Sequence, residues 1–288
     1  MPRAFDHLVL ASHSLAAQAD LYRRLGFNVG ARNQHPWGTQ NHIVQLQGGF
    51  LELIGLGEGF VAPGQSDPAA PFANFLASYL ATQEGFAMLA LRAADADADA
   101  AAFAAVSIGT GALFHFERRG KRADGQDARV AFSLAFAASK LIADAGFFTC
   151  QQHHPENFWN TSAQVHPNTA QRITSVVMVA ENPSAHAEFL SHLTGEREML
   201  ATSMGIEIDT GGGRIEVLTP LAYAFRFGLT AGTDEPHLAA FRVAVADLQA
   251  AGTCLTAAQI PHGRKAGLAI VPPQAAHGVA IVFDQVAA

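Results

Sequence analysis

The stretch FDHLVLA at residues 5–11 opens a unit that runs to Leu53 and decides the fold. Its nearly continuous apolar character predicts a buried strand. The next segment, residues 14–25, has apolar side chains at helical spacing; it begins at Ser14, a good N-cap, and is followed by Gly26, a typical stop. Three further strands are predicted at residues 27–32, 39–46 and 50–56. The unit therefore has the order strand, helix, three strands.

The same order of elements recurs along the chain. A second copy opens at Gly85, a third at Ile173 and a fourth at Leu238. The offset between His7 and Ser175 also separates Leu21 from Phe189, which is the mark of an internal repeat. We therefore predict an α+β fold of four βαβββ modules in two pairs.

The chain divides at a connector rich in Pro, Asn and Ser. This places one domain at residues 1–160, with the main site, and a second, degenerate domain at residues 171–288. In the fourth module we expect a helix at residues 245–251 and a strand at residues 253–258.

Composition narrows the class of protein. The chain has 288 residues and a formal charge of −7 without a basic stripe, which argues against nucleic acid as a partner. No apolar segment is long enough to cross a membrane, and the N-terminus lacks the pattern of a signal peptide. Cys150 and Cys254 lie far apart and are expected to be thiols in a reducing, cytoplasmic compartment.

Two residues of the first module carry potential chemistry. His7 lies in the first predicted strand and Glu52 in the last, each among apolar neighbours. A buried carboxylate requires a partner, because an isolated buried charge is costly. The two side chains either converge on a cation, or face the cleft as hydrogen-bonding groups, or serve the structure alone.

Other candidates surround this pair. His35, Trp37, Thr39 and Asn41 lie in a loop that either contacts a ligand or bonds only to itself. His153, at the end of a strand, either closes the cleft or is solvated. The basic cluster Arg118, Arg119, Lys121 and Arg122 either attracts an anionic substrate or forms a solvated hairpin tip, and we favour the second interpretation. Cys150 is either a nucleophile or an inert thiol, and without a His base in register we favour the thiol.

The amino-acid sequences of several segments resemble those of a known superfamily. The matching stretches are residues 5–10 (FDHLVL), 22–27 (YRRLGF), 50–53 (FLEL), 35–41 (HPWGTQN) and 154–159 (HPENFW). The first three are similar to the first module of glyoxalase-like proteins of the vicinal oxygen chelate superfamily. Residues 35–41 resemble a motif of one glyoxalase-like branch, and residues 154–159 resemble the segment that follows the second module in that branch. The resemblance implies two modules curled around a shared cleft. It also implies a divalent metal ion there (Zn, Ni, Mn or Fe), with His7 and Glu52 at the positions of metal ligands.

The second module departs from the family pattern. Met88 stands where its first ligand is expected, and Thr149 or Cys150 falls near the place of its carboxylate. In the third module Ser175 replaces the histidine and only Glu216 remains. Any metal is therefore expected in the first half, and a third interpretation makes the second half only a scaffold or a homodimer surface.

The resemblance implies a metal-assisted lyase or isomerase acting on a small oxygenated organic molecule, with His7 and Glu52 as its catalytic residues. A ring-cleaving dioxygenase fits less well, because it uses two His and one Glu on iron and no second His stands in register. The alternative is a non-catalytic, drug-sequestering protein like the bleomycin-resistance members of the superfamily.

Overall fold

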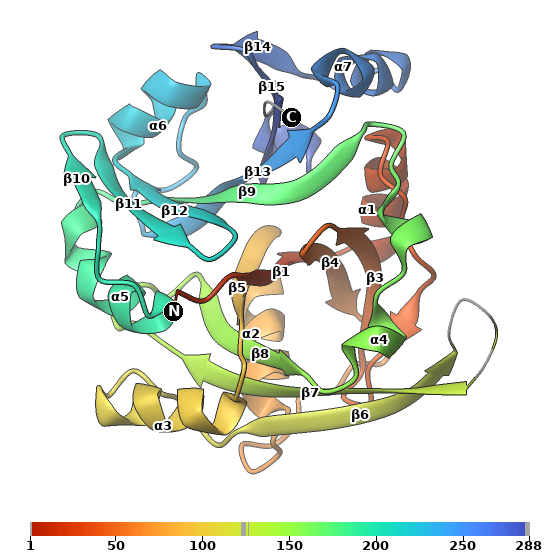
Figure 1. Cartoon of the computed structure of the whole chain (residues 1–288), viewed down its shortest axis with the longest axis vertical. Helices are drawn as coiled ribbons and strands as arrows, with labels where there is room; N and C mark the ends of the chain where they lie inside the picture. The colour runs from red at the N-terminus through yellow and green to blue at the C-terminus, as the bar shows by residue number, and fades with distance from the viewer. Residues whose placement is uncertain (1, 122–124, 126, 286–288) are drawn as a thin grey trace.

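A computed structural model describes residues 2–121, 125 and 127–285 of the chain. These residues form two mixed sheets of eight strands each (Figure 1). The first sheet has the order β2-β3-β4-β1-β5-β8-β7-β6 and the second β10-β11-β12-β9-β13-β16-β15-β14. In the described ranges no helix combines the length and the apolar character needed to span a membrane.

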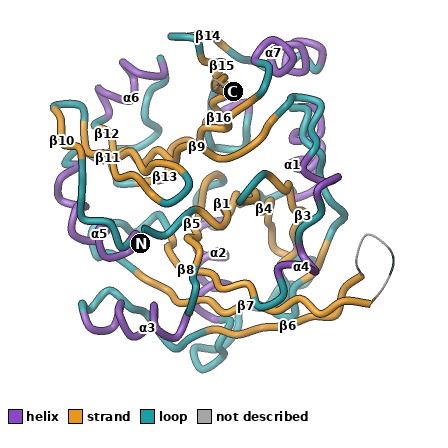
Figure 2. Tube along the Cα trace, in the orientation of Figure 1, coloured by secondary structure: helices purple, strands orange, loops and turns teal. Residues whose placement is uncertain are grey.

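The strands of the first sheet are β1 (Phe5–Ala11), β2 (Asn33–Gln34), β3 (Thr39–Leu46), β4 (Gly49–Leu56), β5 (Gly85–Arg92), β6 (Phe114–Lys121), β7 (Asp127–Ala137) and β8 (Gly146–Gln152). Those of the second are β9 (Ala170–Val179), β10 (Leu200–Thr202), β11 (Gly205–Thr210), β12 (Gly213–Leu218), β13 (His237–Val245), β14 (Gly263–Lys265), β15 (Leu268–Val271) and β16 (Ala280–Gln285). The α-helices are α1 (Leu15–Arg24), α2 (Ala70–Leu80), α3 (Ala96–Ala105), α4 (Pro155–Phe158), α5 (Ala187–Thr194), α6 (Pro220–Phe227) and α7 (Leu248–Ala257). Short 3-10 turns occupy Thr161–Gln164, Pro183–His186 and Pro273–Ala275. Figure 2 shows α3, α5, α6 and α7 toward the outside of the molecule, with β1, β4 and β5 near its centre.

Each sheet joins two βαβββ modules in the same way. β1 pairs in parallel with β4, the last strand of its own module, and antiparallel with β5, the first strand of the next. β9 repeats this arrangement with β12 and β13. The predicted α+β fold of four modules in two pairs is confirmed.

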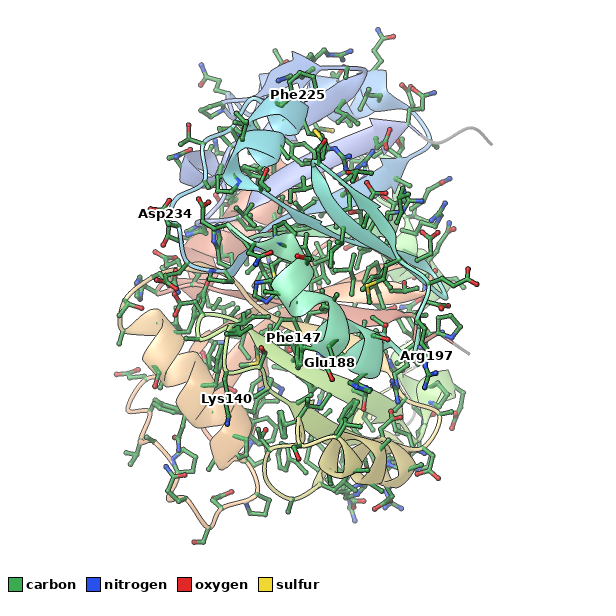
Figure 3. All side chains as sticks on the ribbon, turned by 90° about the vertical axis from the view of Figure 1, so that its left-hand side faces the viewer. Lys140, Phe147, Glu188, Arg197, Phe225 and Asp234 are labelled. Carbon is green, nitrogen blue, oxygen red and sulfur yellow. The ribbon has the colours of Figure 1, made fainter. Side chains whose placement is uncertain are left out.

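The two halves share one apolar core. Phe27 stacks on Phe283, and Phe86 meets Phe241 edge to face. Figure 3 shows Phe147 close to the helix that carries Glu188, where its ring packs edge to face at 5.1 Å on Phe189, the next residue of α5. The division into residues 1–160 and 171–288 stays a prediction, but it crosses this common core.

The connector between the sheets is anchored at the end of α1. Ser14 caps α1 by accepting a hydrogen bond from the amide of Ala17. Gly26 follows α1 with φ +87°, and a Cβ there would lie 2.8 Å from Cβ of Asn168. The side chain of Asn168 in turn donates to the carbonyl of Leu25. Only glycine permits both this backbone conformation and this close approach.

Two of the predicted elements are wrong. Residues 27–32 form no strand, because the amide of Asn28 bonds to Nδ1 of His166 and only Gly30 bonds to β3. Residues 253–258 are not a strand either, since α7 continues to Ala257. Asp247 caps that helix, and its buried stripe runs on to Leu255.

Candidate functional site

A cavity of about 50 Å³ lies inside the curl of the first sheet. Its walls are mostly aromatic, and its polar groups come from β1, β3, β4, β6 and the loop before β3. The lining residues are His7, His35, Trp37, Asn41, Ile43, Phe50, Glu52, Phe72, Phe116, Arg118, Phe132, Leu134, Phe148, Cys150 and Phe158.

His7 is held in one orientation. Its ring stacks on Phe50, and its Nδ1 lies 2.6 Å from Oδ1 of the fully buried Asp6. The other oxygen of Asp6 accepts a hydrogen bond from Gln152. A register shift between Phe5 and His7 interrupts the β1–β5 ladder at Asp6. At this irregularity the side chains of the consecutive residues Asp6 and His7 contact each other. Because an ionised carboxylate only accepts, Nδ1 of His7 carries the hydrogen and Nε2 presents a lone pair when the ring is neutral.

Glu52 faces that lone pair. Its Oε2 lies 3.7 Å from Nε2 of His7, while its Oε1 accepts a 2.5 Å hydrogen bond from Nδ2 of Asn41. Both Glu52 and His7 are only 5% exposed. Two buried acceptors so close together require a shared proton or a cation between them.

Residues of the predicted loop hold the carboxylate of Glu52 in place. Asn33 donates to Oδ1 of Asn41, which turns the amide nitrogen of Asn41 toward both Glu52 and Nε2 of His35, the latter 3.3 Å away. Nδ1 of His35 lies 2.8 Å from Oγ1 of Thr39. Burial lowers the pKa of His35, although the nearby carboxylate of Glu52 opposes this shift. His35 is therefore a neutral member of the network.

The loop residues play different parts. His35, Asn41 and Trp37 line the cavity, whereas Thr39 lies behind His35 and holds its ring. Trp37 stacks on His35 with ring centroids 4.5 Å apart.

The second module offers no matching ligands. Met88 pairs with Gly146 as His7 pairs with Phe50, so the position equivalent to Glu52 is Phe148. The expectation of Thr149 or Cys150 at that position is wrong by one or two residues. Burial, and after it the carboxylate of Asp6, raises the pKa of Cys150, so its thiol stays protonated.

The donor atoms permit a test for a divalent ion. Asp6, His7 and Cys150 offer ligand atoms within 4.8 Å of one another, but Asp6 is bonded to His7 and Gln152, and the thiol is protonated. Nε2 of His7 and Oε2 of Glu52 are a nitrogen and an oxygen at a separation that one ion can bridge. A carboxylate on the far nitrogen of the imidazole is a common companion of metal-bound histidine. This pair therefore fits an ion with two protein ligands.

His153 lies outside the cavity. Its Nε2 is 2.8 Å from Oγ of Ser133, which also lies 3.0 Å from Nδ1 of His115. Ser133 alternates with Phe132 and Leu134 on β7, so these contacts are on the opposite face of the sheet. Burial and the neighbouring His115 lower the pKa of His153.

The interpretation of the basic cluster is wrong for Arg118. Phe114, Phe116 and Arg118 alternate along β6, and Arg118 lines the cavity with Phe116, whereas Arg119 is exposed. Burial lowers the pKa of the Arg118 guanidinium, and the carboxylate of Glu52 opposes the shift. The alternation of Phe114, Phe116 and Arg118 at every second position could have indicated that Arg118 lies on the same face of the strand as the two Phe side chains. Arg122 lies outside the described residues.

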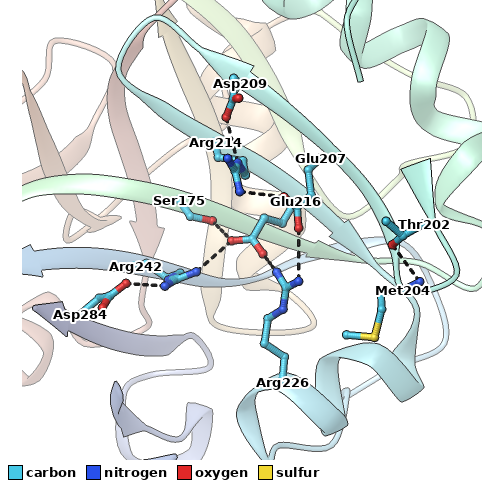
Figure 4. Close-up of polar contacts among 10 residues, drawn as sticks. All are labelled: Ser175, Thr202, Met204, Glu207, Asp209, Arg214, Glu216, Arg226, Arg242 and Asp284. Carbon is cyan, nitrogen blue, oxygen red and sulfur yellow. Dashed lines mark hydrogen bonds and ion pairs between the residues drawn. The ribbon is translucent and has the colours of Figure 1, made fainter. Parts of the chain in front are cut away.

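The second half fills the equivalent place with ion pairs (Figure 4). Oε1 of Glu216 accepts a 2.5 Å hydrogen bond from Ser175, which stands at the position of His7. Its Oε2 pairs with Arg226 of α6, and Arg242 lies 3.4 Å from Oε1. Two arginines thus neutralise the carboxylate. In the first half the corresponding helix, α2, contributes Phe72 to the cavity instead.

Comparisons with known proteins agree with this architecture. The family model of the glyoxalase-like domain matches residues 5–194. A hypothetical protein from Staphylococcus aureus is similar in structure, with a TM-score of 0.67, 10% identity, and coverage of 98% of this chain and 99% of that one. A triple mutant of 4-hydroxymandelate synthase from Streptomyces coelicolor has a TM-score of 0.56 at 15% identity, covering 92% of this chain and 78% of that one.

A third similar structure is 2,2′,3-trihydroxybiphenyl 1,2-dioxygenase from Sphingomonas wittichii, with a TM-score of 0.53 at 9% identity, covering 99% of this chain and 91% of that one. No curated protein sequence matches the chain significantly. At these identities the structural likenesses establish the fold alone. The family match covers most of the chain, and the chain belongs to the glyoxalase-like family of the vicinal oxygen chelate superfamily.

Proposed function

We propose that the protein is a glyoxalase-like enzyme that binds a small oxygenated organic molecule in the first-half cavity and catalyses a lyase or isomerase reaction. The observation that carries the proposal is the approach of His7 Nε2 to Glu52 Oε2 at 3.7 Å, with Asp6 fixing the far nitrogen of the imidazole. A divalent ion held by His7 and Glu52 would polarise a carbonyl or hydroxyl oxygen of the substrate as a Lewis acid.

The side chains around this pair position its two ligand atoms. Asn41 holds Oε1 of Glu52, so Oε2 remains as the carboxylate oxygen that would bind the ion. Asp6 holds Nδ1 of His7, so the imidazole would present Nε2 to the ion in a fixed orientation. The aromatic walls exclude water and orient an apolar substrate body against this pair.

Metal analysis tests the proposal. The purified protein is expected to contain close to one divalent ion per chain. His7→Ala and Glu52→Gln should lose it, while His42→Gln should keep it, since the His42 ring lies outside the cavity and its hydrogen bond among the described residues goes to the carbonyl of Gly30. Absence of a stoichiometric ion, or equal retention in all variants, would remove the metal-assisted reaction.

The second candidate is a non-catalytic protein that sequesters an apolar molecule. The apolar side chains of Met88 and Phe148, in place of ligands from the second module, favour it. It requires tight binding of an aromatic compound that survives Glu52→Gln, without turnover by the metal-loaded protein.

The cytoplasmic location is part of the proposal. It is supported by Cys150 and Cys254, which are both free thiols.

A further inference from the structure

We infer that Arg118 binds a carboxylate group of the ligand, so that the ligand of the first-half cavity is a small aromatic monoacid. The inference rests on the proposed function only in placing the ligand in this cavity; it requires neither catalysis nor a metal.

Arg118 is a charged group placed where water has limited access. It projects from the cavity face of β6 beside Phe116, and it pairs across the ladder with the buried Val130. In the described parts of the chain its guanidinium has no hydrogen-bond or ion-pair partner. Other interior arginines do have partners: Arg226 bonds to Glu207 and Glu216. A half-buried guanidinium with free donors is costly unless a ligand satisfies it.

The geometry of the guanidinium selects the kind of group. Its planar fork matches the two oxygens of a carboxylate. Arg118 is the one such cation among the lining residues, and the lining also contains the carboxylate of Glu52, whose charge opposes the lowering of the Arg118 pKa. A monoanion balances Arg118 alone, whereas a phosphate dianion would place a second negative charge in a cavity that already contains Glu52.

The walls select the body of the ligand. Seven aromatic rings line the cavity, from Trp37, Phe50, Phe72, Phe116, Phe132, Phe148 and Phe158. Trp37 meets Phe116 edge to face at 4.9 Å, and Phe72 meets Phe148 at 6.1 Å. A flat ring continues such edge-to-face contacts, and the small volume of about 50 Å³ disfavours a bulky body.

Binding of three matched probes tests the inference. Phenylacetate, phenylacetamide and phenyl phosphate are titrated while tryptophan fluorescence is followed, since Trp37 lines the cavity and Trp159 packs on Phe50. The wild-type protein is expected to bind phenylacetate at least about tenfold more tightly than the amide, as a charge-assisted pair would give. Phenyl phosphate should bind more weakly than phenylacetate.

Variants then assign the preference to one residue. Arg118→Met should reduce the acid-to-amide ratio to about one, and Arg118→Lys should keep part of it. Arg119→Met is the matched control: it removes the neighbouring, exposed arginine of the same strand and should leave the ratio unchanged. His7→Ala should lose the metal ion but keep the ratio, so that failure of the proposed reaction and failure of this inference give different results.

An acid-to-amide ratio of one in the wild-type protein would overturn the inference. So would an undiminished ratio in a folded Arg118→Met variant, or tighter binding of phenyl phosphate than of phenylacetate. Should Arg118→Met fail to fold, a ratio in Arg118→Lys equal to that of the wild type would contradict recognition by the fork.

Discussion

Nε2 of His7 and Oε2 of Glu52 face each other across 3.7 Å in the first half of the chain, without another hydrogen-bond donor to either atom among the described residues. In the second half Ser175 donates directly to Glu216, and arginines complete the neutralisation. The same fold therefore keeps one carboxylate available and pairs the other with arginines, and we expect the proposed chemistry in the first half.

Asp6 is expected to govern the cation affinity of His7. Asp6→Asn keeps the shape but removes the charge that holds Nδ1–H, so affinity for a divalent ion should fall about 10- to 100-fold by calorimetric titration with Zn²⁺. Asp209→Asn, at a largely exposed carboxylate, is the control. Equal affinity in Asp6→Asn and the wild type would show that Asp6 does not orient the ligand.

Arg226 is expected to stabilise the second half. Arg226→Met leaves the buried carboxylate of Glu216 with weaker compensation, and the free energy of unfolding should fall by about 1–3 kcal/mol in urea titrations, a range reduced because Arg226 is partly exposed. Arg214→Met removes a more exposed arginine that pairs with Glu207 and Asp209, and should cost less than about 1 kcal/mol. Equal losses would contradict the special place of Glu216.

Gly26 is expected to be intolerant of a side chain. Gly26→Ala combines a positive φ with a contact of 2.8 Å to Asn168, and should lower the free energy of unfolding by about 2–4 kcal/mol. Gly48→Ala shares the positive φ but meets nothing within 4 Å, and should cost about 1 kcal/mol. Comparable losses in chemical denaturation would show that the contact with the connector does not matter.

Stability is expected to fall in weak acid because of His166. Burial lowers the pKa of His166 below its usual 6.5, although its hydrogen bond to the carbonyl of Gln45 opposes the shift. The unfolded chain then binds more protons than the native one just below pH 6.5, so the contribution is complete above that pH and is lost as the pH falls toward the native pKa.

Thermal unfolding between about pH 5 and 8 measures this contribution. The advantage of the wild type over His166→Gln should shrink as the pH falls, whereas His13→Gln, at an exposed histidine, should leave the slope unchanged. An advantage of constant size across the range would exclude His166 as the titrating group.

Much of the fold could be predicted from the sequence because each module repeats its own local signals. Ser14 and Gly26 delimit α1, and the offset from His7 to Ser175 relates the two halves. One error occurred where a distant group replaced a local one. The amide of Asn28 bonds to His166, far along the chain, and so the expected strand is lost.

The candidate site was only partly visible in the sequence. His7, Glu52, His35, Trp37 and Asn41 all line the cavity. The sequence indicated the first two as polar groups among apolar strand residues, and the others as members of a loop rich in polar and aromatic side chains. His153 lies on the other face of the sheet. It directly follows the last residue of β8, Gln152, and the sequence does not show on which face of the sheet a side chain at the end of a strand lies. The role of Arg118 was hidden because it stands at the start of a run of basic residues, where charge suggested solvent more strongly than alternation suggested the interior.

Anomalous diffraction from crystals soaked in a divalent metal ion, recorded at the absorption edge of that metal, tests the central claim most directly. The account predicts a peak between Nε2 of His7 and Oε2 of Glu52 that disappears in Glu52→Gln. A peak only at the outer pair His115 and His153, or none in the cavity, would contradict it.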